Sequence, residues 1–271
     1  MKTLRRALAG LVAASLLTLG TTGCIRVWSH GPAETDAAPS VSPTPDLRQA
    51  LVDSTRVFDR GSFLYTVTGG SEDIVGVVDL ASESTAAKFL FDIDGDPGTL
   101  EFILIDEDVW VRIDYGDELN KAAGIDSWSD KYLLLDPARV PDVLDIAAGE
   151  SDSSDPALAA VLFQAATDVR DTGAGTYRGT VDLGKVTESM LLDEAMLEAL
   201  GAAAASIPFE ARIDAEGRLV ELSISTPAAG EIEARNIKIV YSQFGTATPP
   251  RRPTAAQSMR APDAAYELLA D

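Results

Sequence analysis

The sequence predicts an α+β protein organised around one long antiparallel sheet, and three features of the chain indicate this fold. Between residues 63 and 113, short segments alternate apolar and polar residues, the period of strands that bury one face. The turns between these segments are short, and a short turn joins only antiparallel neighbours. Helical patterns are grouped at a few places instead of alternating with the strands, which is typical of α+β proteins. We expect a sheet of this length to curl and to carry its helices on one face.

The first predicted element of the folded part is a helix that begins after Pro45. Asp46 is a suitable N-cap, because its side chain can accept a hydrogen bond from a backbone N–H of the first turn. Apolar residues recur at helical spacing from Leu47 to Phe58, and Gly61 then ends the helix.

Five strands follow this helix and form the first half of the predicted sheet. They cover residues 63–67, 74–78, 87–93, 100–104 and 109–113. Turns rich in glycine and aspartate lie between them at 69–71, 94–98 and 106–108. Because these turns are short, we expect the five strands to form a meander.

The second half of the chain mixes helices and strands. We expect a strand at 131–135, helices at 137–148 and 156–167 around a polar loop at 149–155, and a strand at 176–183. A helix at 187–206, rich in Leu and Met, precedes closing strands at 208–214, 218–226 and 231–244. A change of apolar phase near Asn236 indicates a β-bulge. Residues 246–271 are expected to form an extended tail with a turn of helix near its end.

The N-terminal residues have the pattern of a secretory signal peptide. Basic residues at the start are followed by an uncharged apolar run from Ala7 to Gly20 and by small residues. The run is too short to span a bilayer, which takes about 20 residues. We therefore expect residues 1–23 to be a signal peptide that is removed, and the proline-rich residues 24–45 to be a linker.

Thr21-Thr22-Gly23-Cys24 resembles the lipobox of bacterial lipoproteins, although Thr21 stands where that motif usually has Leu. The resemblance implies that a diacylglyceryl group is attached to the Cys24 thiol and that the chain is cleaved before this residue. Two or more acyl chains give stable membrane anchoring. We expect a protein held at the cell membrane by lipid, such as palmitate, and facing the extracytoplasmic side. A plain secretory signal with an incidental cysteine is the alternative.

The composition argues against several classes of function. The chain carries a formal net charge of −21, and loss of residues 1–23 would take it to −24, which disfavours nucleic acid and anionic lipid as partners. Cys24 and His30 are the only cysteine and histidine, and both precede the folded part, so triad catalysis and zinc sites of the usual kinds are not expected. The Asp92-x-Asp94-x-Asp96 pattern has Pro97 and Ile103 where a calcium loop needs Gly and Glu, and indicates a hairpin turn. We expect no enzyme, no metal and no cofactor.

From residue 46 to residue 245 the chain resembles the LppX/LprG-type lipoproteins of actinobacteria, a group related to the LolA-like lipid carriers. The resemblance rests on the lipobox, the linker, the order of the elements and five short sequence segments. These segments are residues 108–112, 132–137, 175–183, 207–214 and 239–245. It implies a half-barrel sheet whose concave face, closed by helices, encloses an apolar cavity. It also implies a role in holding acylated lipids or glycolipids and moving them across the cell envelope, together with an envelope transport protein.

The function expected from these observations is binding or transport of an amphiphilic ligand. The residues expected to line the cavity are apolar side chains of two strands and of the Met-rich helix: Phe89, Phe91, Phe102, Leu104, Met190 and Met196. Met is adaptable and suits a pocket for variable acyl chains. The alternative is that the Leu and Met side chains of this helix belong to an ordinary hydrophobic core. The chain would then be a tethered accessory module of the envelope that binds other proteins and holds no ligand.

Overall fold

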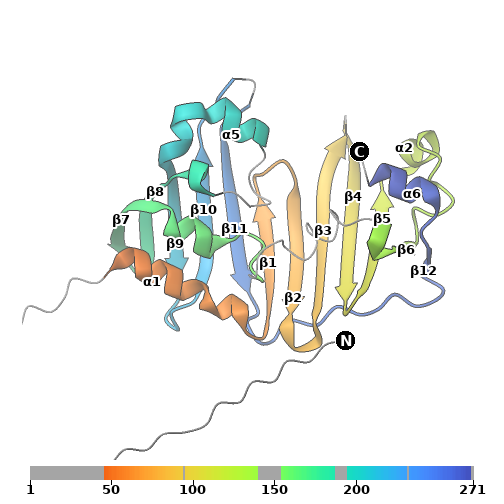
Figure 1. The fold of residues 1–271 in the computed structure, drawn as a ribbon, viewed down its shortest axis with the longest axis horizontal. Helices are drawn as coiled ribbons and strands as arrows, with labels where there is room; N and C mark the ends of the chain where they lie inside the picture. The colour runs from red at the N-terminus through yellow and green to blue at the C-terminus, as the bar shows by residue number, and fades with distance from the viewer. Residues whose placement is uncertain (1–45, 94, 140–153, 187–193, 231, 270–271) are drawn as a thin grey trace, which may run out of the picture. The chain divides into compact units, whose positions relative to one another are not determined.

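A computed structural model describes residues 46–269 except 94, 140–153, 187–193 and 231. It shows a mostly-sheet α+β fold with one 12-stranded mixed sheet, in the order β12-β6-β5-β4-β3-β2-β1-β11-β10-β9-β8-β7 (Figure 1). The two end strands, β12 and β7, do not pair with each other, so the sheet is open. The strands are β1 Ser62–Thr68, β2 Asp73–Asp79, β3 Ser84–Ile93, β4 Asp96–Ile105, β5 Asp108–Asp114, β6 Tyr132–Leu134, β7 Ala166–Gly173, β8 Thr176–Val181, β9 Ile207–Ile213, β10 Leu219–Thr226, β11 Arg235–Ser242 and β12 Ser258–Arg260.

The described helices are short. They are α1 Leu47–Ser54, α2 Asp117–Ala122, α4 Ala159–Gln164, α5 Glu194–Leu200 and α6 Asp263–Leu268. The predicted N-cap is confirmed, because Oδ1 of Asp46 accepts a 3.1 Å hydrogen bond from the Gln49 backbone N–H. Among the described residues, no helix is long and apolar enough to cross a membrane.

The predicted meander is confirmed, since β1 to β5 pair consecutively and antiparallel. The turn between β3 and β4 is tighter than expected. Ile93 pairs with Asp96, so Asp96, Pro97 and Gly98 belong to β4 and not to a turn. Oδ1 of Asp92 accepts a hydrogen bond from the Gly95 backbone N–H, and this contact stabilises the hairpin tip.

The helix predicted at 156–167 is wrong at its end, because β7 begins at Ala166. Strand β7 was not expected, since its sequence ATDVRDTG places few apolar residues on either face. It lies at the edge of the sheet, where a strand needs little apolar surface. The strand predicted at 176–183 ends at Val181, and Leu183–Lys185 form a 3₁₀ turn capped by the Asp182 side chain.

Two further helices differ from their predictions. Of the helix expected at 187–206, residues 194–200 form α5 and Gly201–Ser206 continue as a 3₁₀ helix, while 187–193 lie outside the described residues. Of the helix expected at 137–148, Pro137–Arg139 form a 3₁₀ turn, and the remainder lies outside the described part of the chain.

The bulge predicted near Asn236 is wrong. Strand β11 begins only at Arg235, and its register with β10 is continuous from Arg235 to Val240. The change of apolar phase marks the start of the strand. A register shift occurs instead between β9 and β10, at Leu219 and Glu221.

The residues beyond Gly245 are part of the domain and not only an extended tail. They run along one end of the sheet from β11 toward β6 (Figure 1), and β12 then pairs parallel with β6. This pairing makes the sheet mixed, where a purely antiparallel one was expected. Helix α6 follows and buries Ala265 completely. The described residues from 46 on therefore form one compact unit, without a boundary at Gly245.

The two faces of the sheet differ in what covers them. The helix face carries Phe63, Tyr65 and Val67 of β1 and the side chains in register with them, and the helices pack on this face. The outer face carries the alternate side chains, such as Leu64 and Thr66. Both buried hydrophobic clusters of the described residues lie on the helix face.

Candidate functional site

The helix face has two separate cores, one toward each end of the sheet. The larger core joins β7–β11, β1 and β2 to α1, α4 and α5. The smaller core joins β4–β6 to α6 and to the segment around Ile125 and Trp128. Strand β3 lies between them, and Phe89 packs against both. The helix face of β3 and β4 is therefore the place where the two cores meet.

The expected cavity residues divide between these cores. Phe89 and Phe102 are brought together, with ring centroids 5.9 Å apart and planes at 87°. Phe102 is 4% exposed, and Leu104 packs against the same smaller core. Met196 is buried in the larger core. Met190 and Cys24 lie outside the described residues.

Phe91 occupies a distinct position near the tip of the β3–β4 hairpin. Its ring covers Gly98 of β4, where an added Cβ would lie 2.1 Å from the ring. The ring also lies 6.0 Å from that of Tyr115, whose backbone N–H donates to Oδ1 of Asn120. Phe91, Leu100 and Leu104 are only half-buried, and Ile93 is 37% exposed, although all four lie on the helix face. This part of the helix face is therefore apolar but incompletely covered by the residues that the structure describes.

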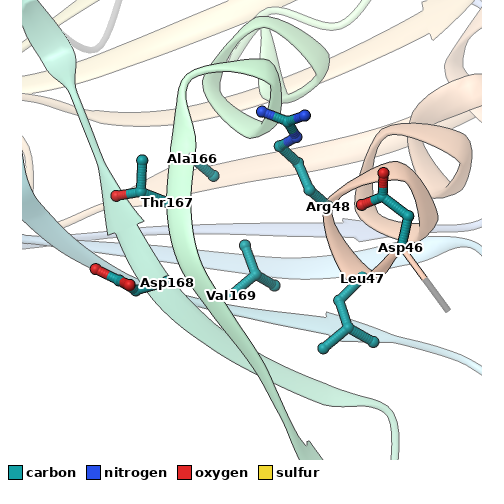
Figure 2. Close-up of a pocket in the computed structure, with 7 residues that line it drawn as sticks. All are labelled: Asp46, Leu47, Arg48, Ala166, Thr167, Asp168 and Val169. Carbon is teal, nitrogen blue, oxygen red and sulfur yellow. The ribbon is translucent and has the colours of Figure 1, made fainter. Parts of the chain in front are cut away.

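An open hollow of about 500 Å³ lies at the opposite end of the sheet, between the start of α1 and strand β7. Figure 2 shows Asp46, Leu47 and Arg48 on its α1 side and residues 166–169 on its β7 side. None of the expected cavity residues lines it. Its wall has a small apolar part, from Leu47, Ala166 and Val169, and a charged rim. The hollow is too exposed to enclose a lipid.

The carboxylate of Asp155 is buried beside the larger core, and it was not predicted from the sequence. Asp155 is 2% exposed and accepts hydrogen bonds from the Tyr241 hydroxyl at 2.7 Å and from the Ala159 and Ala157 backbone N–H groups at 2.7 and 3.1 Å. Burial raises the pKa of Asp155, and these hydrogen bonds only partly oppose it. Burial, together with the nearby Asp155 charge, also raises the pKa values of Tyr241 and Tyr65. This group fixes the start of α4 on the sheet and contains no exposed reactive atom.

The outer face carries a second polar network, centred on Glu101 of β4. Its carboxylate accepts from Lys88 Nζ at 3.0 Å, Arg112 Nη2 at 2.5 Å and the Tyr132 hydroxyl at 2.7 Å. Burial alone would raise the pKa of Glu101, but these three donors lower it overall. Burial and the hydrogen bond to Glu101 raise the pKa of Tyr132 to about 12. The network spans β3 to β6 and acts as a cross-strand clamp.

Among the described residues, no group of three or more His, Cys, Asp or Glu side chains is placed to hold a metal ion. Comparison with models of protein families and with the curated proteins finds no match for this chain. The likeness to LppX/LprG-type lipoproteins therefore stays a prediction from the sequence.

Proposed function

We propose that the protein is a membrane-tethered, extracytoplasmic and non-enzymatic binder or carrier of an amphiphilic ligand, of the lipid or glycolipid class. In this proposal the lipid on Cys24 holds the chain at the membrane, and the open sheet is a half-barrel. The acyl part of the ligand lies on the helix face of β3 and β4, where the two cores meet.

The observation that carries the proposal is the incomplete cover of this apolar surface. Phe91, Leu100 and Leu104 are half-buried on a face that is otherwise packed at both ends. Burial of apolar surface contributes about 25 cal/mol per Å², so an acyl chain placed here gains several kcal/mol. The flat ring of Phe91 over Gly98 offers one wall of such a site.

A second candidate function is a tethered accessory module that binds another envelope protein. It is favoured by the edge-to-face contact of Phe89 with Phe102, because side chains that pack on each other need no ligand between them. The two candidates differ in whether lipid accompanies the purified protein.

Neighbouring residues of β3 provide a matched test. Phe91 lies on the helix face and Leu90 on the outer face, so a substitution at each changes one face only. We expect Phe91→Gln to reduce co-purified lipid several-fold and Leu90→Gln to leave it unchanged, with thermal unfolding confirming that both variants are folded. Equal lipid content in the two variants would place the ligand elsewhere.

A further inference from the structure

The half-buried Glu72 lies beside the apolar surface that the proposed function assigns to the acyl part of the ligand. It is the residue before β2, and β2 pairs Asp73 with the outward-facing Leu90 of β3. Because successive side chains of a strand alternate between faces, Glu72 belongs to the helix face, next to Phe91. Its partial burial agrees with this position, whereas Asp73 on the outer face is exposed.

The Glu72 carboxylate forms no hydrogen bond or ion pair with another side chain in the described part of the chain. Burial raises its pKa, because the carboxylate loses water without gaining a donor. A polar group that is withdrawn from water without a hydrogen bond costs free energy. A ligand group that donates a hydrogen bond to Glu72 would reduce this cost.

The Phe91 ring leans away from Glu72. It lies over Gly98 of β4 and 6.0 Å from the ring of Tyr115, which follows β5. Both contacts are on the β4 side of β3, whereas Glu72 is on the β2 side. Neighbouring strands are about 4.8 Å apart, so the carboxylate is close to the ring without being covered by it. Glu72 and Phe91 are accordingly both half-buried.

Further polar groups surround the Phe91 ring. Asp96 pairs with Ile93 on the helix face and is exposed. Tyr115 is half-buried, and burial raises the pKa of its hydroxyl, which therefore keeps its proton. Carboxylates accept hydrogen bonds, and a phenol hydroxyl both donates and accepts them. This combination of aromatic rings with acceptor groups suits a head group that carries several hydroxyls.

The charges at this end of the helix face are mainly negative. Helix α2 adds two acidic residues and one lysine. Arg235 of β11 belongs to the same face, because it alternates with the buried Ile237, but β2 and β1 separate it from β3. An anionic head beside Phe91 would therefore lie nearer to Glu72 and Asp96 than to Arg235. Such unfavourable contacts discriminate between ligands as effectively as favourable ones do.

We infer that Glu72 and Phe91 form a subsite for an uncharged glycosyl head of the ligand, and that this subsite discriminates against lipids with an anionic head. The sugar hydroxyls donate hydrogen bonds to the Glu72 carboxylate, and one face of the sugar lies against the Phe91 ring. The acyl part then extends along the helix face toward Leu100 and Leu104. The inference rests on the proposed function, because it concerns the head of the same ligand.

Competition among three lipids with the same dioleoyl chains tests the subsite on the full chain, purified in detergent. Digalactosyl diacylglycerol has an uncharged head with hydroxyl donors, phosphatidylcholine has no hydroxyl or N–H donor and no net charge, and phosphatidylglycerol is anionic. The protein is incubated with an equimolar mixture and purified again, and the retained lipids are quantified by mass spectrometry. We expect the wild type to retain several-fold more of the galactolipid than of either phospholipid.

Charge reversal on the two faces supplies the matched variants. Glu72→Lys should lower the ratio of galactolipid to phosphatidylglycerol several-fold, and Glu72→Gln should lower it less. Asp73→Lys makes the same kind of change on the outer face and should leave the ratio at the wild-type value. Thermal unfolding checks that each variant is folded.

The outcomes separate this inference from the proposed function. Retention of no lipid by the wild type would overturn both. Equal retention of the three lipids, or an equal change of the ratio in Glu72→Lys and Asp73→Lys, would overturn the subsite alone. A wild-type preference for phosphatidylglycerol that Arg235→Gln abolishes would also overturn it and would assign the head to Arg235.

Discussion

The hydroxyl of Tyr241 on β11 donates a 2.7 Å hydrogen bond to Oδ1 of Asp155, and this contact fastens the start of α4 to the sheet. Both side chains are buried, and Asp155 also accepts from the backbone N–H groups of Ala157 and Ala159. A helix of six residues has little stability of its own, so such contacts determine where it packs.

Tyr241→Phe is therefore expected to destabilise the protein. The change removes a hydrogen bond to a buried carboxyl group, and a buried polar group that loses its partner costs about 1–3 kcal/mol. Urea unfolding followed by circular dichroism measures the loss. Tyr177→Phe is the control, because Tyr177 is a half-buried tyrosine that packs against the same core. Equal effects of the two substitutions would show that the Asp155 contact contributes nothing.

The raised pKa of Asp155 predicts an unusual pH dependence. The unfolded chain releases this proton near pH 4, whereas the folded chain retains it to higher pH. The stability that Asp155 contributes is therefore full below about pH 4 and is lost as the pH rises through the folded pKa. The unfolding free energy of the wild type relative to Asp155→Asn should fall over this range. A difference that rises with pH would contradict the assignment.

Glu101 should show the opposite dependence. Its folded pKa is lowered, so its contribution is present above the ordinary glutamate range of about pH 4.3 and is lost as the pH falls through the folded pKa. The unfolding free energy of the wild type relative to Glu101→Gln should increase as the pH rises through this window. A difference in unfolding free energy that does not change with pH would mean that the contacts with Lys88, Arg112 and Tyr132 do not persist in solution.

Gly76 of β2 is predicted to resist substitution. An added Cβ would lie 2.2 Å from the ring of Tyr65, which is fully buried and has little room to move. Gly76→Ala should cost about 1–3 kcal/mol, as overpacking of a core does. Gly70→Ala in the β1–β2 turn is the control, because its nearest atom would lie at 3.4 Å. Comparable melting temperatures for the two variants would show that the Tyr65 ring can shift away.

Arg252 is predicted to hold the C-terminal segment against the sheet. Its guanidinium pairs with Asp106 and Asp108 and lies 5.4 Å from the Trp110 ring centroid. Arg252→Ala should speed hydrogen exchange of the Tyr132 and Ala261 backbone N–H groups, which bond to the Gln257 and Leu134 carbonyls at the β12–β6 pairing. The neighbouring exposed Arg251→Ala should leave both rates unchanged. Unchanged rates in Arg252→Ala would show that β12 is held without this arginine.

The sequence was informative where structure is local. Alternation such as Phe63, Tyr65 and Val67 predicted β1 to β5, and Asp46 predicted the start of α1. Strand β12 was missed because it has three residues and pairs with β6, more than a hundred positions away, which no local pattern reveals. The outward-facing Val75 and Val77 of β2 did have a signal, since the run from Ile74 to Val78 breaks the alternation of a one-sided strand.

The candidate site was harder to predict than the strands. The apolar character of Phe89, Phe102 and Met196 predicted that these side chains face inward. It did not predict that Phe102 and Met196 would belong to different cores. That division depends on which strands pair and on where the helices pack, and both are long-range properties. The buried Asp155 was invisible for the same reason, because its partner Tyr241 lies 86 positions away.

Lipid extraction and mass spectrometry of the full chain, purified gently from membranes, tests the proposed function most directly. Acyl groups that the proposal places on Cys24 would be covalent and would stay with the protein, so extracted lipid would report a bound ligand. The proposal predicts a stoichiometric acylated lipid in the wild type and in Leu90→Gln, and a several-fold lower amount in Phe91→Gln. A well-folded wild-type protein without extractable lipid would contradict it and favour the accessory module.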